Sequence, residues 1–198
     1  MTRVIADITM SLDGFVTGPD PGPGQGLGRG GEPLHRWALE SDDEVDVAVL
    51  RDAVEASGAV VMGRRLFDMI DAPDGWDDEM GYGASHSASP PFFVVTHSPP
   101  ETVRLDLSFT FVTDGIESAI ARARAAAGSR DVFVMGGGDV IAQCVDGGLV
   151  DELRLHLSPI LLGSGTPLFD GVRPRELVQR EVRVSPAATH LSYALRSG

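Results

Sequence analysis

The chain has 198 residues, of which 42% are hydrophobic and 23% charged, a composition that fits one globular domain with a substantial core. Its formal net charge of −13 argues against nucleic acid or an anionic membrane surface as a partner. The single cysteine, Cys144, excludes an internal disulfide framework, and no apolar run reaches the roughly 20 residues of a membrane span. We therefore expect a cytoplasmic protein that acts on a small molecule.

The cationic side chains are all arginines, because the sequence contains no lysine. This excludes lysine Schiff bases and the lysine of a nucleotide-binding P-loop. An anionic ligand must therefore be held by arginine, main-chain N–H groups or hydroxyls. Since no paired ligands stand at metal-binding spacing, we expect no metal.

The first predicted element is a strand over residues 3–12, where apolar and polar residues alternate. Asp13-Gly14 ends this strand, and residues 15–16 offer a short continuation. Residues 18–33 are rich in glycine and proline and form a long irregular loop. A loop of this length in a compact chain is usually a functional segment such as a lid, or else it is disordered.

A helix is predicted over residues 33–57, because apolar residues keep helical spacing across it. A buried strand follows at residues 59–62, and Gly63 then opens another helix with Arg64 and Arg65 in its first turn. Cations at the start of a helix are mildly unfavourable, which indicates an anionic ligand there. The alternative is that the two arginines are ordinary surface charges.

The middle of the chain continues the alternation of strand and helix. A second long loop, residues 71–91, precedes predicted strands at 92–96 and 110–113, and an amphipathic helix covers residues 116–127.

A glycine triplet follows the next predicted strand. Residues 132–135 are apolar without alternation, as in a central parallel strand covered on both faces. Gly136, Gly137 and Gly138 come next, and a helix begins near Val140. Glycines let a ligand approach the main chain, and the first N–H groups of a helix lack internal partners, so this turn is a candidate phosphate cradle. A glycine turn can equally be only a packing device.

After Gly148 the pattern changes to strands without intervening helices, at residues 153–157, 177–184 and 191–195. Such strands are typical of an antiparallel edge. The sequence therefore predicts one α/β domain over residues 1–198, with three layers, a mostly parallel central sheet and antiparallel C-terminal edge strands.

Five motifs occur in a distinctive order, namely Ser11-Leu-Asp-Gly14, Val61-Met-Gly-Arg-Arg65, Val95-Thr-His-Ser98, Val134-Met-Gly-Gly-Gly138 and Leu161-Leu-Gly-Ser-Gly-Thr-Pro-Leu-Phe169. With them the sequence resembles the dihydrofolate reductase superfamily, and more closely its branch related to the reductase domain of the bifunctional riboflavin-biosynthesis enzyme. The resemblance covers about residues 3–195. It implies a dihydrofolate-reductase-like fold, NADPH as cofactor and a homodimer.

The resemblance also implies which residues meet the cofactor. The Met-Gly-Arg turn would cap its phosphates, the hydroxyl-bearing turn after the next strand would lie beside the adenosine 2′-phosphate, and the glycine triplet would receive the diphosphate. The first strand and its turn would flank the nicotinamide. The implied contacts are Ile8, Thr9, Val16, Gly63, Arg64, Arg65, Thr96, His97, Ser98, Gly136, Gly137, Gly138, Asp139, Val140 and Ile141.

On the substrate side, the resemblance implies that Asp13 lies beside a ribose, and Asp13 is also the candidate proton donor, with an ordered water as the alternative. Asp13 can equally be a turn residue before glycine. His35 and Trp37 are candidates for a wall of the substrate site or for the core, and Thr166 either reaches the site or belongs to a turn. The remaining histidines outside the motifs, interpreted as structural or exposed, are His86, His156 and His190.

We therefore predict an NADPH-dependent oxidoreductase that acts on CH–NH or CH–OH groups of a small heterocyclic or ribosylamino-pyrimidine-type substrate, similar to 5-amino-6-(5-phosphoribosylamino)uracil reductase. Typical dihydrofolate reductases hold the pterin with a carboxylate on the helix after the lid loop, and residues 32–40 offer none at an unambiguous place. Two alternatives stay open, a pterin or dihydrofolate reductase and a non-catalytic protein that binds NADPH or a pterin.

Overall fold

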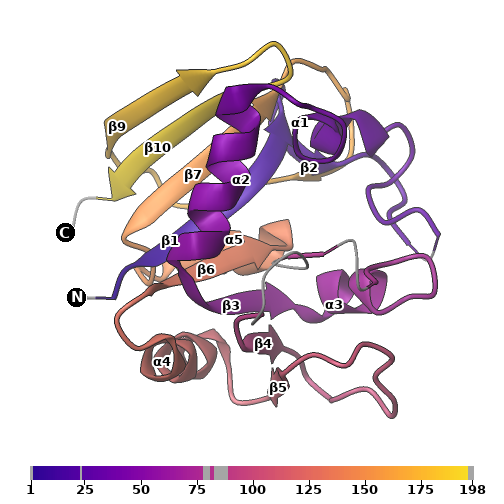
Figure 1. Ribbon diagram of the computed structural model, residues 1–198, viewed down its shortest axis with the longest axis vertical. Helices are drawn as coiled ribbons and strands as arrows, with labels where there is room; N and C mark the ends of the chain where they lie inside the picture. The colour runs from indigo at the N-terminus through magenta and orange to yellow at the C-terminus, as the bar shows by residue number, and fades with distance from the viewer. Residues whose placement is uncertain (1, 23, 78–80, 83–88, 196–198) are drawn as a thin grey trace.

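The computed structural model describes residues 2–22, 24–77, 81–82 and 89–195. Within them, eight strands form one sheet in the order β5-β4-β3-β6-β1-β7-β10-β9, and helices pack on both of its faces (Figure 1). This is the three-layer α/β architecture predicted from the sequence. His86 and part of the predicted loop 71–91 lie outside the described residues.

The larger part of the sheet is parallel. Its strands are β1 (Val4–Ser11), β3 (Ser57–Gly63), β4 (Phe92–Val95), β5 (Phe109–Val112), β6 (Asp131–Gly136) and β7 (Glu152–Ser158). Every residue of β3 is buried, which explains its unbroken apolar sequence, because helices cover both faces of a parallel sheet.

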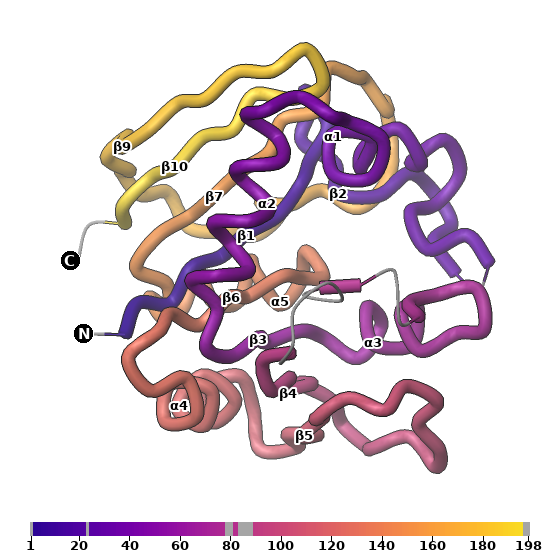
Figure 2. Tube along the Cα trace, in the orientation of Figure 1, coloured from indigo at the N-terminus to yellow at the C-terminus, as the bar shows by residue number. Residues whose placement is uncertain are grey.

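The late strands form the predicted antiparallel edge. β10 (Thr189–Leu195) lies between β7 and β9 (Leu177–Val184) and runs antiparallel to both. The first strand of the chain, β1, lies in the middle of the sheet between β6 and β7, as the indigo segment in Figure 2 shows.

The segment after β1 differs from the sequence interpretation. β2 (Phe15–Thr17) does not continue the first strand but pairs with β8 (Thr166–Pro167) in a separate two-stranded sheet. The chain turns away at Gly14, whose φ of +91° is open to glycine and strained for other residues. This small sheet carries Val16 and Thr166 to the same place.

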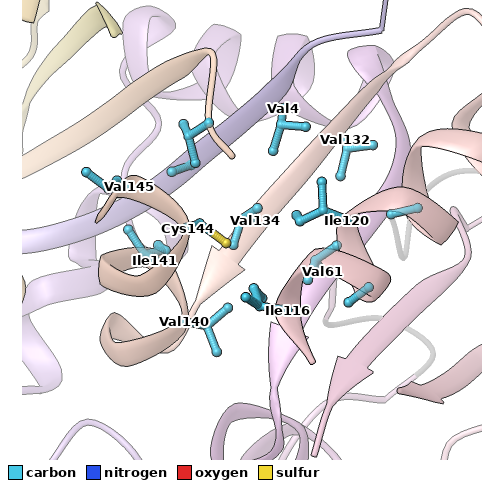
Figure 3. Close-up of a cluster of buried hydrophobic side chains, with 14 of the residues drawn as sticks. Val4, Val61, Ile116, Ile120, Val132, Val134, Val140, Ile141, Cys144 and Val145 are labelled. Atoms are coloured by element: carbon cyan, nitrogen blue, oxygen red, sulfur yellow. The ribbon is translucent and has the colours of Figure 1, made fainter. Parts of the chain in front are cut away.

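The helices α4 (Ile116–Ala127) and α5 (Gly138–Asp146) cover one face of the sheet. Their apolar stripes meet β1, β3 and β6 in the largest core cluster, part of which Figure 3 shows. Cys144 is fully buried in this cluster.

The opposite face carries α2 (Glu44–Ala56) and α3 (Arg64–Ile70). Phe67 of α3 packs within a cluster formed with β3 and β4, and Ala53 of α2 packs with residues of β1 and β6. The side chains of Asp7 and His156, described below, also lie on the α2 side of the sheet.

The single helix predicted over residues 33–57 is wrong. A 3-10 turn, η1 (Glu32–His35), leads into the short helix α1 (Arg36–Leu39), and α2 begins only at Glu44. Asp43 caps α2, because its Oδ1 accepts a hydrogen bond of 2.9 Å from the main-chain N–H of Val45. Aspartate and serine favour such caps over helix interiors, and the apolar spacing concealed this break. No helix in the described part of the chain is long and apolar enough to cross a membrane.

Candidate functional site

Two of the predicted glycine turns face each other at the carboxyl ends of β3 and β6. A Cβ atom placed on Gly63 would lie 3.7 Å from the main-chain nitrogen of Gly137 and 3.9 Å from the carbonyl oxygen of Gly136. It would also lie 2.8 Å from Cγ2 of Val140, so a side chain at Gly63 would displace that valine. The parallel arrangement of β3 and β6 brings these turns together, since the carboxyl ends of parallel strands meet at one sheet edge.

The main chain beside the glycine triplet is open on one side. A Cβ atom on Gly137 would meet no atom within 4 Å, so a ligand can approach the backbone at this point. The helix α5 begins at Gly138, and no side chain caps its start. Its first N–H groups and the positive end of its dipole therefore suit an anionic group.

Arg64 joins this region to the turn that follows β4. Its Nη1 donates a hydrogen bond of 2.6 Å to the carbonyl oxygen of Ser98, and its Nε donates one of 2.6 Å to Oδ1 of Asp68. The hydroxyl of Thr96 donates to the same Ser98 carbonyl at 2.8 Å. Arg65 and His97 are exposed nearby in sequence, and Arg65 makes no ion pair within the described residues.

The small β2–β8 sheet closes the other side of the glycine triplet. A Cβ atom on Gly138 would lie 3.0 Å from Cγ2 of Val16 and 3.9 Å from Cγ2 of Thr166. The Thr166 hydroxyl accepts a hydrogen bond of 2.8 Å from Thr17. Val16 and Thr166, from opposite ends of the chain, therefore both border the predicted cradle.

The other predicted cofactor contacts divide by burial. Asp139 is exposed in the first turn of α5, whereas Ile141 is fully buried in the core. Ile8 is partly buried against the core cluster on the side of α4 and α5.

Asp13 is engaged by the chain itself. Its carboxylate accepts hydrogen bonds from the Ser11 hydroxyl at 2.6 Å, from the Gly163 N–H at 2.7 Å and from the Leu162 N–H at 3.1 Å. These bonds, that from Ser11 first, lower the pKa of Asp13 to about 2. At neutral pH the group is ionised, so it can accept a hydrogen bond from a ligand but holds no proton to give.

Trp37 and Thr9 are hydrogen-bonded to each other. Nε1 of Trp37 donates a hydrogen bond of 2.9 Å to the Thr9 hydroxyl, and both side chains are buried. His35 is half-buried beside them, and burial, with a smaller contribution from the charge of His156, lowers its pKa to about 4. His35 is therefore a neutral imidazole near neutral pH.

The sequence interpretation missed a chain of four polar side chains on the α2 side of the sheet, three of them buried and one, Asp7, partly buried. Nε2 of His156 lies 3.0 Å from Oδ1 of Asp7, and its Nδ1 lies 2.8 Å from Nδ1 of His190. Nε2 of His190 lies 2.8 Å from Oδ1 of Asp46, whose Oδ2 accepts a hydrogen bond from Ser41. We call these four residues the Asp7–Asp46 chain.

The charges within this chain shift the pKa values of its members. Burial alone raises the pKa of Asp7, but the charge of His156 and the hydrogen bond with it outweigh burial, and the net direction is downward. The pKa of Asp46 is also lowered, because hydrogen bonds from Ser41, Ser185 and His190 outweigh its burial. Burial lowers the pKa of His190 despite its contact with Asp46. Both carboxylates are therefore held ionised.

The sequence contained only one indication of the Asp7–Asp46 chain, an aspartate in the middle of the first strand. The pairing itself depends on register, because Thr9 stands opposite His156 and His156 stands opposite His190 in neighbouring strands. Among the described residues, no group of three or more His, Cys, Asp or Glu side chains is placed to hold a metal ion.

Comparison with protein families matches residues 2–191 to the model of the RibD C-terminal domain. The uncharacterized protein YyaP of Bacillus subtilis (strain 168) is 26% identical over 179 residues, which cover 87% of this chain and 83% of YyaP.

Solved structures share the fold. A protein named for riboflavin biosynthesis from Shewanella sp. PV-4 is 24% identical with a TM-score of 0.74, covering 99% of this chain and 100% of that one. A diaminohydroxyphosphoribosylaminopyrimidine deaminase/5-amino-6-(5-phosphoribosylamino)uracil reductase from Thermotoga maritima is 15% identical with a TM-score of 0.60, covering 98% of this chain and 57% of that one. At these identities the likeness establishes the fold.

Proposed function

Because the chain belongs to the RibD C-terminal domain family, we propose that it is an NADPH-dependent reductase of a small heterocyclic or ribosylamino-pyrimidine-type substrate. Membership confirms the resemblance found in the sequence motifs and supports an oxidoreductase. The use of NADPH and the class of substrate are proposals that go beyond family membership.

The observation that carries the proposal is the convergence of the predicted turns at one sheet edge. Gly63 lies against Gly136 and Gly137, and Arg64 is hydrogen-bonded to Ser98. A ligand with several phosphates needs main-chain N–H groups and arginines from separate segments, particularly in a chain without lysine. This arrangement favours a dinucleotide with its phosphates along these turns.

The residues present fit NADPH. The open side of Gly137 and the uncapped start of α5 would hold the diphosphate, and Arg64, with Nη2 free of hydrogen bonds to the described residues, would meet a phosphate near Ser98. When bound, NADPH supplies a hydride from its nicotinamide, and the protein orients it and excludes water.

On the substrate side, we propose that Asp13 accepts a hydrogen bond from a substrate hydroxyl, such as that of a ribose. Its ionised state suits an acceptor, and it is exposed at the turn after β1. Thr166 is half-buried beside Gly138 and would border the nicotinamide side of the same site. The segment 18–31, which precedes η1, would act as the lid over the site.

The test is NADPH binding followed by a turnover screen. We expect tight NADPH binding and NADPH oxidation with a ribosylaminopyrimidine acceptor, in a screen that also includes pterins and quinone-like acceptors. Binding without turnover of any acceptor would favour the non-catalytic alternative, and turnover of dihydrofolate alone would favour the pterin reductase. Absence of NADPH binding would overturn the proposal.

Arg64→Ala tests the phosphate contact directly. We expect it to weaken NADPH about 10-fold or more and NADH less, because a charge-assisted hydrogen bond to the 2′-phosphate is lost. Titration calorimetry with both dinucleotides measures this difference. Arg122→Ala, on α4 and paired with Asp114, is the matched control and should change neither affinity. Equal losses of affinity for NADPH and NADH would indicate that Arg64 contacts the diphosphate, which both dinucleotides carry, and not the 2′-phosphate.

A further inference from the structure

The Asp7–Asp46 chain has three hydrogen-bond contacts between its side chains, but the usual protonation states of its members supply a proton for only two of them. Each of its three contacts needs one proton between the two heavy atoms: Asp7 with His156, His156 with His190, and His190 with Asp46. Two ionised aspartates and two neutral histidines bring only two protons. Two neutral histidines that each donate from Nε2 to an aspartate would leave two bare Nδ1 lone pairs facing each other at 2.8 Å. The geometry therefore requires a third proton.

The extra proton lies between the two Nδ1 atoms, so the histidine pair shares it. Asp7 and Asp46 are both held ionised and act as acceptors. His156 donates from Nε2 to Asp7, and His190 donates from Nε2 to Asp46. Trp37 covers this pair, with its ring centroid 4.3 Å from that of His156.

The end of the chain at Asp7 has an unused acceptor. Oδ2 of Asp7 is buried and has no hydrogen-bond partner within the described part of the chain. A buried carboxylate oxygen without a partner is costly, so a bound molecule that brings a hydrogen-bond donor would relieve it. The opposite end is closed, because both oxygens of Asp46 are engaged.

We propose that the Asp7–Asp46 chain stores one proton and delivers it through the Asp7 carboxyl group to the substrate during reduction. Asp7 is then the catalytic acid, and His156, His190 and Asp46 are residues that hold and position the proton. This inference rests on the proposed reductase function, since a hydride transfer to a C=N or C=O group must be completed by a proton on the heteroatom.

Bound NADPH would supply a hydride to the substrate carbon and be oxidised, and the electron pair of the π bond would move to the heteroatom. The Nε2 proton of His156 passes to Asp7, and a half-turn about Cβ–Cγ of Asp7 presents it to the heteroatom, where the new N–H or O–H bond forms. Asp7 returns to the carboxylate, and His156 is left neutral.

A cavity offers the route by which the proton is replaced. A space of about 120 Å³ lies between α2 and the strands β7, β9 and β10, and both His156 and His190 line it. Water in this cavity can return a proton to the histidine pair without passing through the substrate site.

The histidine pair is surrounded by charged groups of both signs, most of which are paired with each other. Arg154 is paired with Glu152, and Arg183 is paired with Glu181 and Asp52. The titratable and charged groups that face or act on the histidine pair are Asp7 of β1, His35 of η1, Asp46 and Asp52 of α2, Arg154 of β7, and Glu181 and Arg183 of β9.

Nitrogen-15 NMR of the histidine side chains, recorded without cofactor, tests the stored proton. We expect one histidine of the pair to carry protons on both ring nitrogens at neutral pH, and a scalar coupling across the hydrogen bond between the two Nδ1 atoms. His35→Gln, His86→Gln and His97→Gln assign the pair by elimination, and neutral His35 is the internal reference. Two singly protonated rings in the pair would overturn the proposal.

Asp7→Asn tests the delivery of the proton. We expect kcat to fall by about 10²-fold or more, with NADPH affinity unchanged within about twofold, and the doubly protonated histidine to disappear from the spectrum. The matched control is Asp52→Asn, because Asp52 borders the cavity beside the histidine pair but is not a member of the Asp7–Asp46 chain, and this variant should leave kcat within about twofold. Unchanged kcat in Asp7→Asn would overturn the delivery step.

The two arms separate this inference from the proposed function. The NMR experiment requires neither NADPH nor a substrate. If it detects the stored proton in a protein that binds no NADPH, the proposed reductase function fails but the stored proton stands. If Asp7→Asn does not fold, His156→Gln serves instead, with the solvent isotope effect on kcat as the second readout. An unchanged kcat and isotope effect there would count against the chain as the proton source.

Discussion

At the scale of single residues, Gly137 and Gly63 have opposite reasons for being glycine. A Cβ atom on Gly137 would enter open space, and its φ of −67° suits any residue. A Cβ atom on Gly63 would stand 2.8 Å from Val140. The first glycine therefore leaves open space beside the main chain, and the second keeps two chain segments in contact.

We predict that Gly137→Ala leaves the free energy of unfolding unchanged within about 1 kcal/mol, because the methyl group meets no atom of the protein. The same change should weaken NADPH, because the methyl group fills the approach to the main chain. Gly63→Ala is the contrasting variant, and it should cost about 1–3 kcal/mol by overpacking against Val140. Urea unfolding and calorimetric titration measure the two effects. An unchanged NADPH affinity in Gly137→Ala would show that the diphosphate does not bind at this turn.

The pH dependence of stability gives a second test at a single residue. The folded-state pKa of Asp13 is lowered to about 2, so its hydrogen bonds stabilise the protein fully above the ordinary carboxyl pKa, and this contribution disappears as the pH falls through about 2. Asp13→Asn should lower the melting temperature at neutral pH, and the difference from the wild type should shrink over that acidic interval. Asp42→Asn, at an exposed position, is the control. A constant difference across the interval would show that Asp13 acts through geometry and not through its charge.

At the scale of elements, sequence patterns were sufficient where local chemistry decides the structure. The apolar runs of β3, β4 and β6 and the glycine turns after β3 and β6 are local signals, and all of them were found in the structure. The start of α2 and the β2–β8 pairing were missed. Ser41 to Asp43 form a cap that interrupts an otherwise helical spacing, and β2 pairs with a strand far away in sequence.

The cap of α2 can be measured. Asp43→Ala should lower the free energy of unfolding by about 1 kcal/mol, because the N–H of Val45 loses its acceptor. The neighbouring variant Asp42→Ala changes an exposed side chain of the same type and should have a much smaller effect. Urea unfolding curves give both values. Equal effects would mean that the charge of the segment, and not the cap, stabilises the helix.

Part of the candidate site could not be predicted from the sequence, because it depends on which strands lie side by side. The glycine triplet and Arg64 could be predicted because each stands beside a recognisable strand end. The Asp7–Asp46 chain could not, because it exists only when β1 lies beside β7 and β7 beside β10. Asp46 also lies beyond residues 32–40, where a carboxylate was sought, and both of its oxygens are engaged.

At the scale of the whole molecule, the β9 edge of the sheet remains open. Leu177, Val182 and Val184 are exposed on β9, and they stand opposite Leu195, Leu191 and Thr189 of β10 in the antiparallel register. An exposed row of apolar side chains on an edge strand favours pairing with a second copy of the chain.

We predict a homodimer that uses this β9 surface. Sedimentation velocity should give the mass of two chains for the wild type and of one chain for Val182→Asp/Val184→Asp. Since both valines are exposed in the single chain, the double variant should keep its fold and change the free energy of unfolding by only about 0.5 kcal/mol. Leu39→Asp, an equally exposed leucine on α1, is the control and should remain dimeric. A monomeric wild type would disprove this prediction.

The central place of β1 also governs how the protein can be made. The amino-terminal strand is synthesised first, yet its neighbours β6 and β7 lie more than a hundred residues later in the chain. During translation β1 must therefore wait, with its apolar side chains unprotected, until most of the polypeptide has left the ribosome. Such long sequence separation between paired strands slows folding and lengthens exposure to aggregation.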